Sequence, residues 1–143
     1  MSENEERNLR LVLEHFAAEG AHDYKATLAT LADEIEYRMK PLGWVMRGKE
    51  EVTRYYDLWW TAFPDVSIKI DRLNAAGEWV IAECTAIATH SGPFMGVPPT
   101  GRKVTARVCC LIRVRDGKMV EESVYYDQLE RLLQIGSTLT LDG

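Results

Sequence analysis

The side chains that most often bind metals or act as nucleophiles are sparse in this sequence. Its three histidines are far apart and form no HxxxH or HExxH pattern, which are the spacings that place two imidazoles on one metal ion. The three cysteines, Cys84, Cys109 and Cys110, include no CxxC pair. We therefore expect no metal site, and we interpret the cysteines as buried structural thiols.

Two residues near the ends of predicted strands could take part in acid–base chemistry. His90 precedes a glycine- and proline-rich segment, where its imidazole could polarise a carbonyl group or hydrogen-bond the backbone of that segment. Asp127 lies on the same face of the last strand as Tyr125 and Ser123, because alternate strand residues point to one side. A carboxylate there could act as a base, or it could cap a helix that begins at Gln128. The residues alone leave both pairs of roles open.

The spacing of apolar residues predicts that helices come first along the chain. The first segment has helical periodicity, with a capping box formed by Ser2 and Glu5 at its start and Gly20 at its end. Asp23 can cap a second helix, and helical spacing returns over 48–63. The apolar faces of these helices have to pack against another layer of secondary structure.

Alternation of apolar and polar residues predicts strands for most of the rest. We expect strands over 35–39, 66–70, 78–90, 103–115 and 118–127, and a short helix over 128–135. The order α-α-β-α-β-β-β-β is typical of an α+β fold, with a mostly antiparallel sheet and helices on one of its faces. We predict a single domain over 1–143, with loose ends over 1–7 and 137–143.

Length and composition limit the function classes. A chain of 143 residues with 46% hydrophobic and 27% charged residues is typical of one soluble globular domain. The net charge of −5 and the absence of a Lys/Arg cluster argue against nucleic acid as a partner. No apolar run approaches the roughly 20 residues of a membrane span, and the acidic N-terminus is unlike a signal peptide. We expect a cytoplasmic protein that does not bind membranes.

Two sets of side chains suggest a ligand cavity. One face of the predicted strand 78–90 carries mostly small side chains, which could leave a cavity or let a helix pack closely: Val80, Ala82, Cys84, Ala86 and Ala88. The aromatic residues are more numerous than a small core needs: Tyr37, Trp44, Tyr55, Tyr56, Trp59, Trp60 and Phe63. Most of them should be core residues, but we expect Tyr37 and Trp59 to line a flat apolar slot.

The inward face of the last strand is ambiguous. Val120, Glu122, Val124 and Tyr126 are the more apolar set, and simple patterning places them inside. If the interior of the fold holds a reactive polar site, the face that carries Asp127 would point inward instead. Val120, Val124 and Tyr126 would then lie outside and could form an oligomer contact.

Several motifs of the second half of the chain resemble those of a known family. They are the segments WWTAFPD at 59–65, THSGPFMGVPPTGR at 89–102, RVRDGK at 113–118, DQL at 127–129 and LQIG at 133–136. This pattern resembles the SnoaL-like polyketide cyclase (ester cyclase) family, within the nuclear-transport-factor-2-like or ketosteroid-isomerase-like superfamily. The resemblance implies a cone in which a curved sheet wraps a hydrophobic pocket.

The resemblance also implies a reaction. It suggests a cofactor-free intramolecular aldol ring closure on a hydrophobic ketone or ester, with Asp127 as general acid/base, assisted by Tyr125 and His90. Tyr125 would donate a hydrogen bond to the developing enolate. The substrate-binding residues that we expect are Tyr37, Tyr56, Trp59, Phe63, Phe94, Met95, Cys110 and Ser123, with Phe94 and Met95 at the edge of a lid.

Two positions depart from the family pattern and keep other functions open. Cys110 stands where the polyketide cyclases carry a histidine, and Glu122-Ser123 stands where they often have His-Trp. Because a thiol cannot replace an imidazole near neutral pH, the particular reaction does not follow from the resemblance. The alternatives are another acid–base reaction, such as isomerisation or epoxide hydrolysis, and a non-catalytic small-molecule-binding module. Both catalytic interpretations, which use Asp127, would fail if Asp127 were exposed or engaged only in capping a helix.

The expected partners are a hydrophobic small-molecule ligand and a second copy of the chain. The family resemblance implies a homodimer through the exposed face of the sheet. Tyr126, Val124 and Leu111 would suit such a contact.

Overall fold

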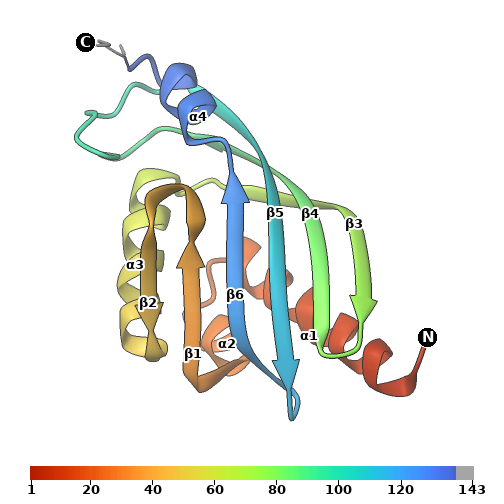
Figure 1. The fold of residues 1–143 in the computed structure, drawn as a ribbon. Helices are drawn as coiled ribbons and strands as arrows, with labels where there is room; N and C mark the ends of the chain where they lie inside the picture. Colours follow the sequence, from red (N-terminus) through yellow and green to blue (C-terminus); the bar gives the residue numbers. More distant parts are fainter. Residues whose placement is uncertain (138–143) are drawn as a thin grey trace.

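The computed structural model describes residues 1–137, which form helices packed on one curved sheet (Figure 1). The helices are α1 (Glu3–Gly20), α2 (Tyr24–Ala29), α3 (Gly48–Ala62) and α4 (Gln128–Gln134), with a 3-10 turn, η1, at Lys40–Leu42. The strands are β1 (Leu31–Met39), β2 (Trp44–Arg47), β3 (Ser67–Ala76), β4 (Trp79–Thr89), β5 (Lys103–Arg115) and β6 (Lys118–Tyr126). The α+β class is confirmed.

The sheet has the strand order β2-β1-β6-β5-β4-β3, and only the β1–β6 pair is parallel. The long hairpin of β5 and β6, with its turn at Asp116 and Gly117, therefore forms the centre of the sheet. Helix α1 packs on β3 and β4, whereas α3 packs on β1 and β2. Helix α4 follows β6 and contacts β5 at one end of the sheet (Figure 1). The mostly antiparallel sheet is as predicted.

The helix starts follow the capping residues of the sequence. Ser2 and Glu5 form a reciprocal capping box, so the helix begins at Glu3 and residues 3–7 are not the loose end that we expected. The Asp23 side chain accepts a hydrogen bond from the backbone N–H of Ala26 at the start of α2. The other predicted loose end begins at residue 137, and its residues 138–143 lie outside the described part of the chain.

Two differences from the predicted order concern the edge of the sheet. Strand β2 was not predicted, because its four residues, Trp44–Arg47, are too few for a clear alternation. It pairs with β1 after the turn that Pro41 and Gly43 make, with Gly43 at a φ of 68°. Strand β1 begins at Leu31 rather than at Ile35, and its first part shifts register against β6 between Leu31 and Glu36. That irregular start does not produce a two-residue period.

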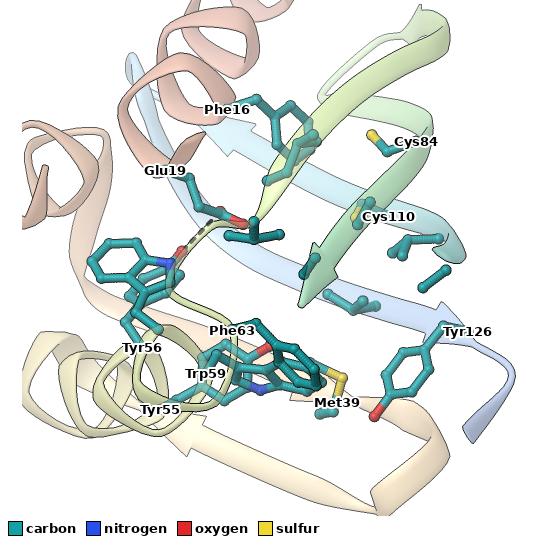
Figure 2. A pocket seen from close by; sticks show the side chains of 18 of the residues that line it. Phe16, Glu19, Met39, Tyr55, Tyr56, Trp59, Phe63, Cys84, Cys110 and Tyr126 are labelled. Atoms are coloured by element: carbon teal, nitrogen blue, oxygen red, sulfur yellow. Dashed lines mark hydrogen bonds between the residues drawn. The ribbon is translucent and has the colours of Figure 1, made fainter. Parts of the chain in front are cut away.

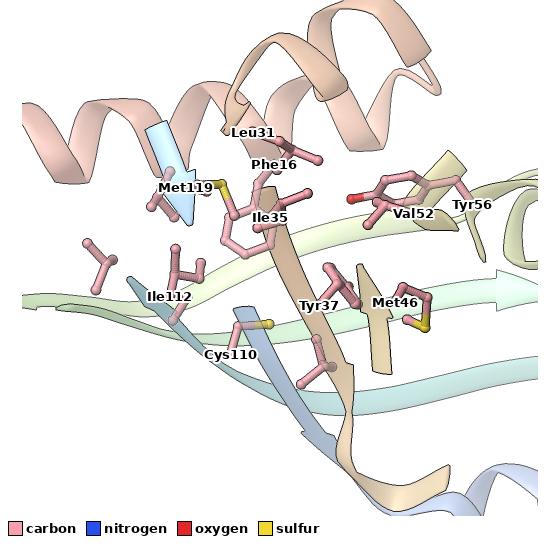
Figure 3. Close-up of a cluster of buried hydrophobic side chains, with 14 of the residues drawn as sticks. Phe16, Leu31, Ile35, Tyr37, Met46, Val52, Tyr56, Cys110, Ile112 and Met119 are labelled. Atoms are coloured by element: carbon pink, nitrogen blue, oxygen red, sulfur yellow. The ribbon is translucent and has the colours of Figure 1, made fainter. Parts of the chain in front are cut away.

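The main core lies between the helices and one face of the sheet (Figure 3). Alternate β5 residues supply this face as the strand pattern predicts, and the set Val104, Ala106, Cys110, Ile112 and Val114 is buried. Val12 and Phe16 of α1 and Val52 and Tyr56 of α3 belong to the same buried cluster. Among the described residues, no helix is both long and apolar enough to cross a membrane.

Candidate functional site

A cavity of about 110 Å³ lies between the sheet and the helices (Figure 2). Its floor is formed by small side chains of the two neighbouring strands β4 and β5: Cys84, Ala86, Ala88, Ala106 and Cys110. Of the two possibilities left open for the small face of β4, the structure thus shows a cavity. Larger side chains at these positions would fill it, so the space follows directly from the sequence of these strands.

The wall opposite this floor is aromatic. Tyr55, Tyr56 and Trp59 come from α3, and Phe63 directly follows this helix (Figure 2). Tyr37 comes from β1. Their rings touch one another in tilted and stacked pairs with centroids 5.0–6.4 Å apart. Of the substrate-binding residues that the sequence suggested, the structure brings Tyr37, Tyr56, Trp59, Phe63 and Cys110 to this cavity.

The α1 end of the cavity carries a buried acidic cluster that the sequence analysis missed. Glu122 of β6 and Glu19 of α1 line the cavity, and His15 lies behind them with no exposed surface. The Nε2 atom of His15 is 3.1 Å from Oε2 of Glu19 and 3.8 Å from Oε2 of Glu122. The Tyr56 hydroxyl donates a hydrogen bond of 3.2 Å to Glu19. One imidazole therefore sits between two carboxylates.

A hydrogen-bond relay fixes the tautomer of His15. The Thr30 hydroxyl donates to the carbonyl oxygen of Thr27 at 2.7 Å, so it has to accept a proton from Nδ1 of His15, which is 2.8 Å away. Nε2 is consequently the nitrogen that gains or loses a proton. When it is protonated, it faces both carboxylates with a positive charge.

Burial and mutual charge shift the pKa values of this cluster. Burial raises the pKa of Glu122 from its ordinary 4.5 to about 7, although the charge of His15 opposes this effect. Burial alone would lower the pKa of His15, but the hydrogen bond to Glu19 and the charges of Glu122 and Glu19 outweigh it and raise that pKa. Glu122 is therefore a carboxyl group that exchanges its proton near neutral pH.

The other polar groups of the cavity are neutral hydrogen-bond donors. Burial raises the pKa of the Tyr37, Tyr55 and Tyr56 hydroxyls well above their ordinary value. Burial also raises the pKa of the Cys110 thiol, and it raises the pKa of the Cys84 thiol to about 12. Neither thiol is a nucleophile at neutral pH. In the part of the chain that the structure describes, no group of His, Cys, Asp or Glu side chains has the arrangement of a metal site.

The α4 end of the cavity is cationic. The guanidinium of Arg131 stacks on the rings of Tyr126 and Trp59, with its carbon 3.9 Å and 4.4 Å from the two centroids. Arg131 is 94% buried, since its relative exposure is 6%. The sequence analysis missed Arg131, because an arginine in a short amphipathic helix usually faces solvent.

The structure places Asp127 and Tyr125 outside the cavity. Asp127 is exposed, and its side chain accepts a hydrogen bond of 3.0 Å from the backbone N–H of Glu130, which makes it the N-cap of α4. Tyr125 is 44% exposed, and both residues border a shallow hollow on the other side of the sheet. Ser123 is buried but does not line the cavity either.

Simple patterning thus identified the inward face of β6 correctly. Glu122, Val124 and Tyr126 line the cavity, so the interpretation that turned Asp127 inward is wrong. Val124 and Tyr126 cannot form a contact on the open face of the sheet for the same reason. The one signal that could have identified Glu122 was a single carboxylate in an otherwise apolar inward set.

His90 and the segment after it have a structural position. His90 is fully buried, and its Nδ1 atom lies 2.9 Å from the Thr100 hydroxyl and accepts the Thr100 backbone N–H at 3.3 Å. Burial lowers the pKa of His90, which keeps the ring neutral. Phe94 is buried against Trp59 and Phe63, whereas Met95 is 44% exposed. Of these, Phe94 supports the cavity wall from behind, and neither His90 nor Met95 lines the cavity.

Comparison with known proteins identifies relatives of the chain. The family model described as SnoaL-like polyketide cyclase matches residues 9–135. The chain is 35% identical over 60 residues to an aklanonic acid methyl ester cyclase of Streptomyces peucetius, a segment covering 42% of this chain and 41% of that protein. It is 32% identical over 65 residues to a nogalonic acid methyl ester cyclase of Streptomyces nogalater, covering 46% and 48%. The matched segments span less than half the length of these relatives.

Solved structures share the fold over nearly the whole chain. A candidate SnoaL-like polyketide cyclase from Jannaschia Sp. CCS1 superposes with a TM-score of 0.90 at 22% identity, covering 97% of this chain and 98% of that one. IdmH, a candidate polyketide cyclase from Streptomyces antibioticus, gives a TM-score of 0.80 at 26% identity, covering 90% and 98%. A LEH-like epoxide hydrolase of M. tuberculosis gives 0.74 at 20% identity, covering 92% and 91%. At such identities these similarities support the fold.

Proposed function

Because the chain belongs to the SnoaL-like polyketide cyclase family, we propose that it is an acid–base enzyme of the cyclase type in which Glu122 is the general base. The observation that carries this proposal is a buried carboxyl group with a pKa of about 7 in the wall of an apolar cavity. A general base works best when its pKa is close to the operating pH. Asp127, the base that the family resemblance suggested, is exposed and caps a helix, so the catalytic interpretations that use Asp127 fail and the proposal depends on Glu122 instead.

The proposed first step is the removal of a proton from carbon. The Glu122 carboxylate takes a proton from the carbon next to a ketone or ester carbonyl, and the electron pair of that C–H bond becomes the enolate. A neutral phenol in the cavity stabilises the enolate oxygen by donating a hydrogen bond. Tyr55 suits this role, because it lines the cavity and burial raises the pKa of its hydroxyl, which therefore keeps its proton to donate.

The proposed second step closes the ring. The enolate carbon attacks a second carbonyl of the same molecule, a carbon–carbon bond forms, and the resulting alkoxide takes back the proton that Glu122 holds. All atoms of the substrate remain in the product, so the reaction needs neither an oxidant nor a reductant. The apolar floor and aromatic wall would hold the two carbons close and exclude water.

His15 would act as a positioning residue in this scheme. When protonated, it favours the ionised form of Glu122, so it sets the pH at which the base becomes active. Cys110 occupies the position where the family pattern has a histidine, and its thiol stays neutral because burial raises its pKa. The acid–base pair of this chain would thus consist of residues from α1 and β6.

Deuterium exchange tests the proposal without knowledge of the natural substrate. A panel of hydrophobic ketones and esters is incubated with the protein in heavy water, and exchange of the protons next to the carbonyl is followed by mass spectrometry. We expect Glu122→Gln to lower the exchange rate about 100-fold or more. Glu121→Gln, a neighbour on β6 whose side chain pairs with Arg38, is the matched control and should keep the wild-type rate.

A further variant separates the two candidate bases. Asp127→Asn preserves a helix-capping side chain and should keep the exchange rate, because Asp127 does not reach the cavity. Exchange that survives Glu122→Gln but disappears in Asp127→Asn would assign the base to Asp127 and refute our proposal. No exchange with any ketone that is shown to bind would favour the non-catalytic binding module.

A further inference from the structure

The charge distribution of the cavity is asymmetric, and its cationic end has no counter-charge. The acidic groups, Glu19 and Glu122, lie at the α1 end, and Arg131 lies at the α4 end. Within residues 1–137, Arg131 forms no ion pair with a carboxylate. Glu122 and Tyr126 are four residues apart on β6, which corresponds to about 13 Å at ~3.3 Å per residue. Arg131, which stacks on Tyr126, is therefore too far away to neutralise Glu122.

A buried guanidinium without a carboxylate is costly to desolvate. Stacking on Tyr126 and Trp59 compensates part of this cost, but a cation–π contact uses none of the N–H donors. The Nη1 atom of Arg131 is buried and has no hydrogen-bond partner among the described residues. Burial lowers the pKa of Arg131, yet an arginine stays protonated in proteins, so the charge persists. This charge is left available inside the cavity.

Two more donors at the same end share this property. Nε1 of Trp59 and the hydroxyl of Tyr126 are also buried and lack a hydrogen-bond partner in the described part of the chain. Both residues line the cavity and both contact the guanidinium of Arg131. Buried polar groups of native proteins are almost always paired, so a cluster of unpaired donors indicates a site that a ligand completes. Donors together with a positive charge fit an anion with several acceptor oxygens.

We propose that the α4 end of the cavity binds a carboxylate of the ligand through Arg131, Trp59 and Tyr126. The ligand would then be an apolar cyclic acid whose carboxylate is held here while its other end lies near Glu122. The inference that the ligand is a keto acid rests on the proposed function. The inference that a carboxylate binds at the α4 end does not depend on that function. The two curated relatives described above are named for methyl esters, which carry no charge to pair with an arginine.

The size of the cavity limits the ligand further. Its volume of about 110 Å³ is below the roughly 300–1,000 Å³ of pockets for drug-sized ligands. It is closer to the engineered cavity of about 150 Å³ that accommodates benzene. We therefore expect an acid whose apolar part is a single ring.

Binding of two probes that differ only in charge tests the carboxylate site. The probes are benzoate and its methyl ester, and their dissociation constants are measured by calorimetry at pH 7. A charge-assisted hydrogen bond contributes enough for the wild type to bind benzoate about 10- to 100-fold more tightly than the ester. Arg131→Met should remove this preference and leave the affinity for the ester within a few-fold. Arg54→Met, on the exposed face of α3, is the control and should keep the preference.

Arg131→Lys keeps the charge and should retain part of the preference, which allows the test to proceed if the methionine variant does not fold. Equal affinity of the wild type for the two probes would overturn the proposal, as would a preference that persists in Arg131→Met. The result is separate from the deuterium exchange. A preference for benzoate without deuterium exchange would refute the role of Glu122 as base and support the carboxylate site. Exchange without a preference for benzoate would refute the carboxylate site and support the base.

Discussion

Replacing Glu122 by glutamine should make the protein more stable at pH 8 while changing its stability little at pH 5. Glutamine has the size of a protonated glutamate and carries no charge. At pH 5 the buried Glu122 is protonated, so the two side chains are nearly equivalent. At pH 8 the wild type has to hold a carboxylate in an environment that disfavours it, whereas the variant does not.

The magnitude follows from the displacement of the pKa. The pKa of Glu122 rises from 4.5 to about 7, and at about 1.4 kcal/mol per pH unit this amounts to about 3 kcal/mol. A group whose pKa is raised in the folded state contributes stability that is complete below the unfolded pKa and is lost as the pH rises through the folded one. The window in which the wild type loses this contribution is therefore about pH 4.5 to 7. The advantage of Glu122→Gln should grow across that window and then level off.

Urea unfolding at half-unit steps from pH 5 to pH 8 measures this difference. Glu121→Gln is the control, because Glu121 is the preceding residue of β6 and pairs with Arg38 away from the cavity. A partly exposed pair contributes about 1 kcal/mol or less, so this variant should show no gain in stability over the same range. The reasoning would be refuted if Glu122→Gln were destabilised equally at every pH, because Glu122 would then be an ordinary hydrogen-bonding group.

Three further predictions follow from the same arrangement. His15→Asn removes a positive charge beside Glu122 and should move the rising limb of the exchange rate to higher pH; an unchanged limb would show that His15 does not influence the base. Asp127→Ala should lower the free energy of unfolding, measured with urea, by about 1 kcal/mol because the helix cap is lost. The rate of deuterium exchange, measured by mass spectrometry, should not change. The family resemblance implies a homodimer through the open face of the sheet, where Ile81 is 39% exposed. In such a dimer, Ile81→Lys should shift the mass measured by size-exclusion chromatography from dimer to monomer. Lys25→Ala, at an exposed position of α2, is the control and should leave the mass unchanged.

The fold was largely predictable, because its determinants are local. The capping box of Ser2 and Glu5 sets the start of α1, and the Asp116-Gly117 pair makes the tight β5–β6 turn with both residues at positive φ. The strict alternation of β5 defines the face that becomes the core. Strand β2 has no comparable signal, because its pairing with β1 depends on the preceding turn rather than on its own four residues.

The candidate site was less predictable, because it depends on contacts between distant segments. The cavity itself could be anticipated from the small side chains of β4, of which Ala86 and Ala88 line it. The pairing of His15 with Glu122 joins α1 to the last strand, and no local spacing predicts it. The face of Asp127 was misassigned because a motif position was given more weight than the apolar pattern of β6.

The proposed chemistry depends on Glu122 being a buried carboxyl group that titrates near neutral pH. Nuclear magnetic resonance of protein labelled with ¹³C at the glutamate side-chain carboxyls measures this directly, with Glu122→Gln to assign the signal. We predict one carboxyl resonance with a midpoint near pH 7 that is missing in the variant. If the resonance that disappears in the variant titrates below pH 5, Glu122 is an ordinary carboxylate and the proposed chemistry loses its base.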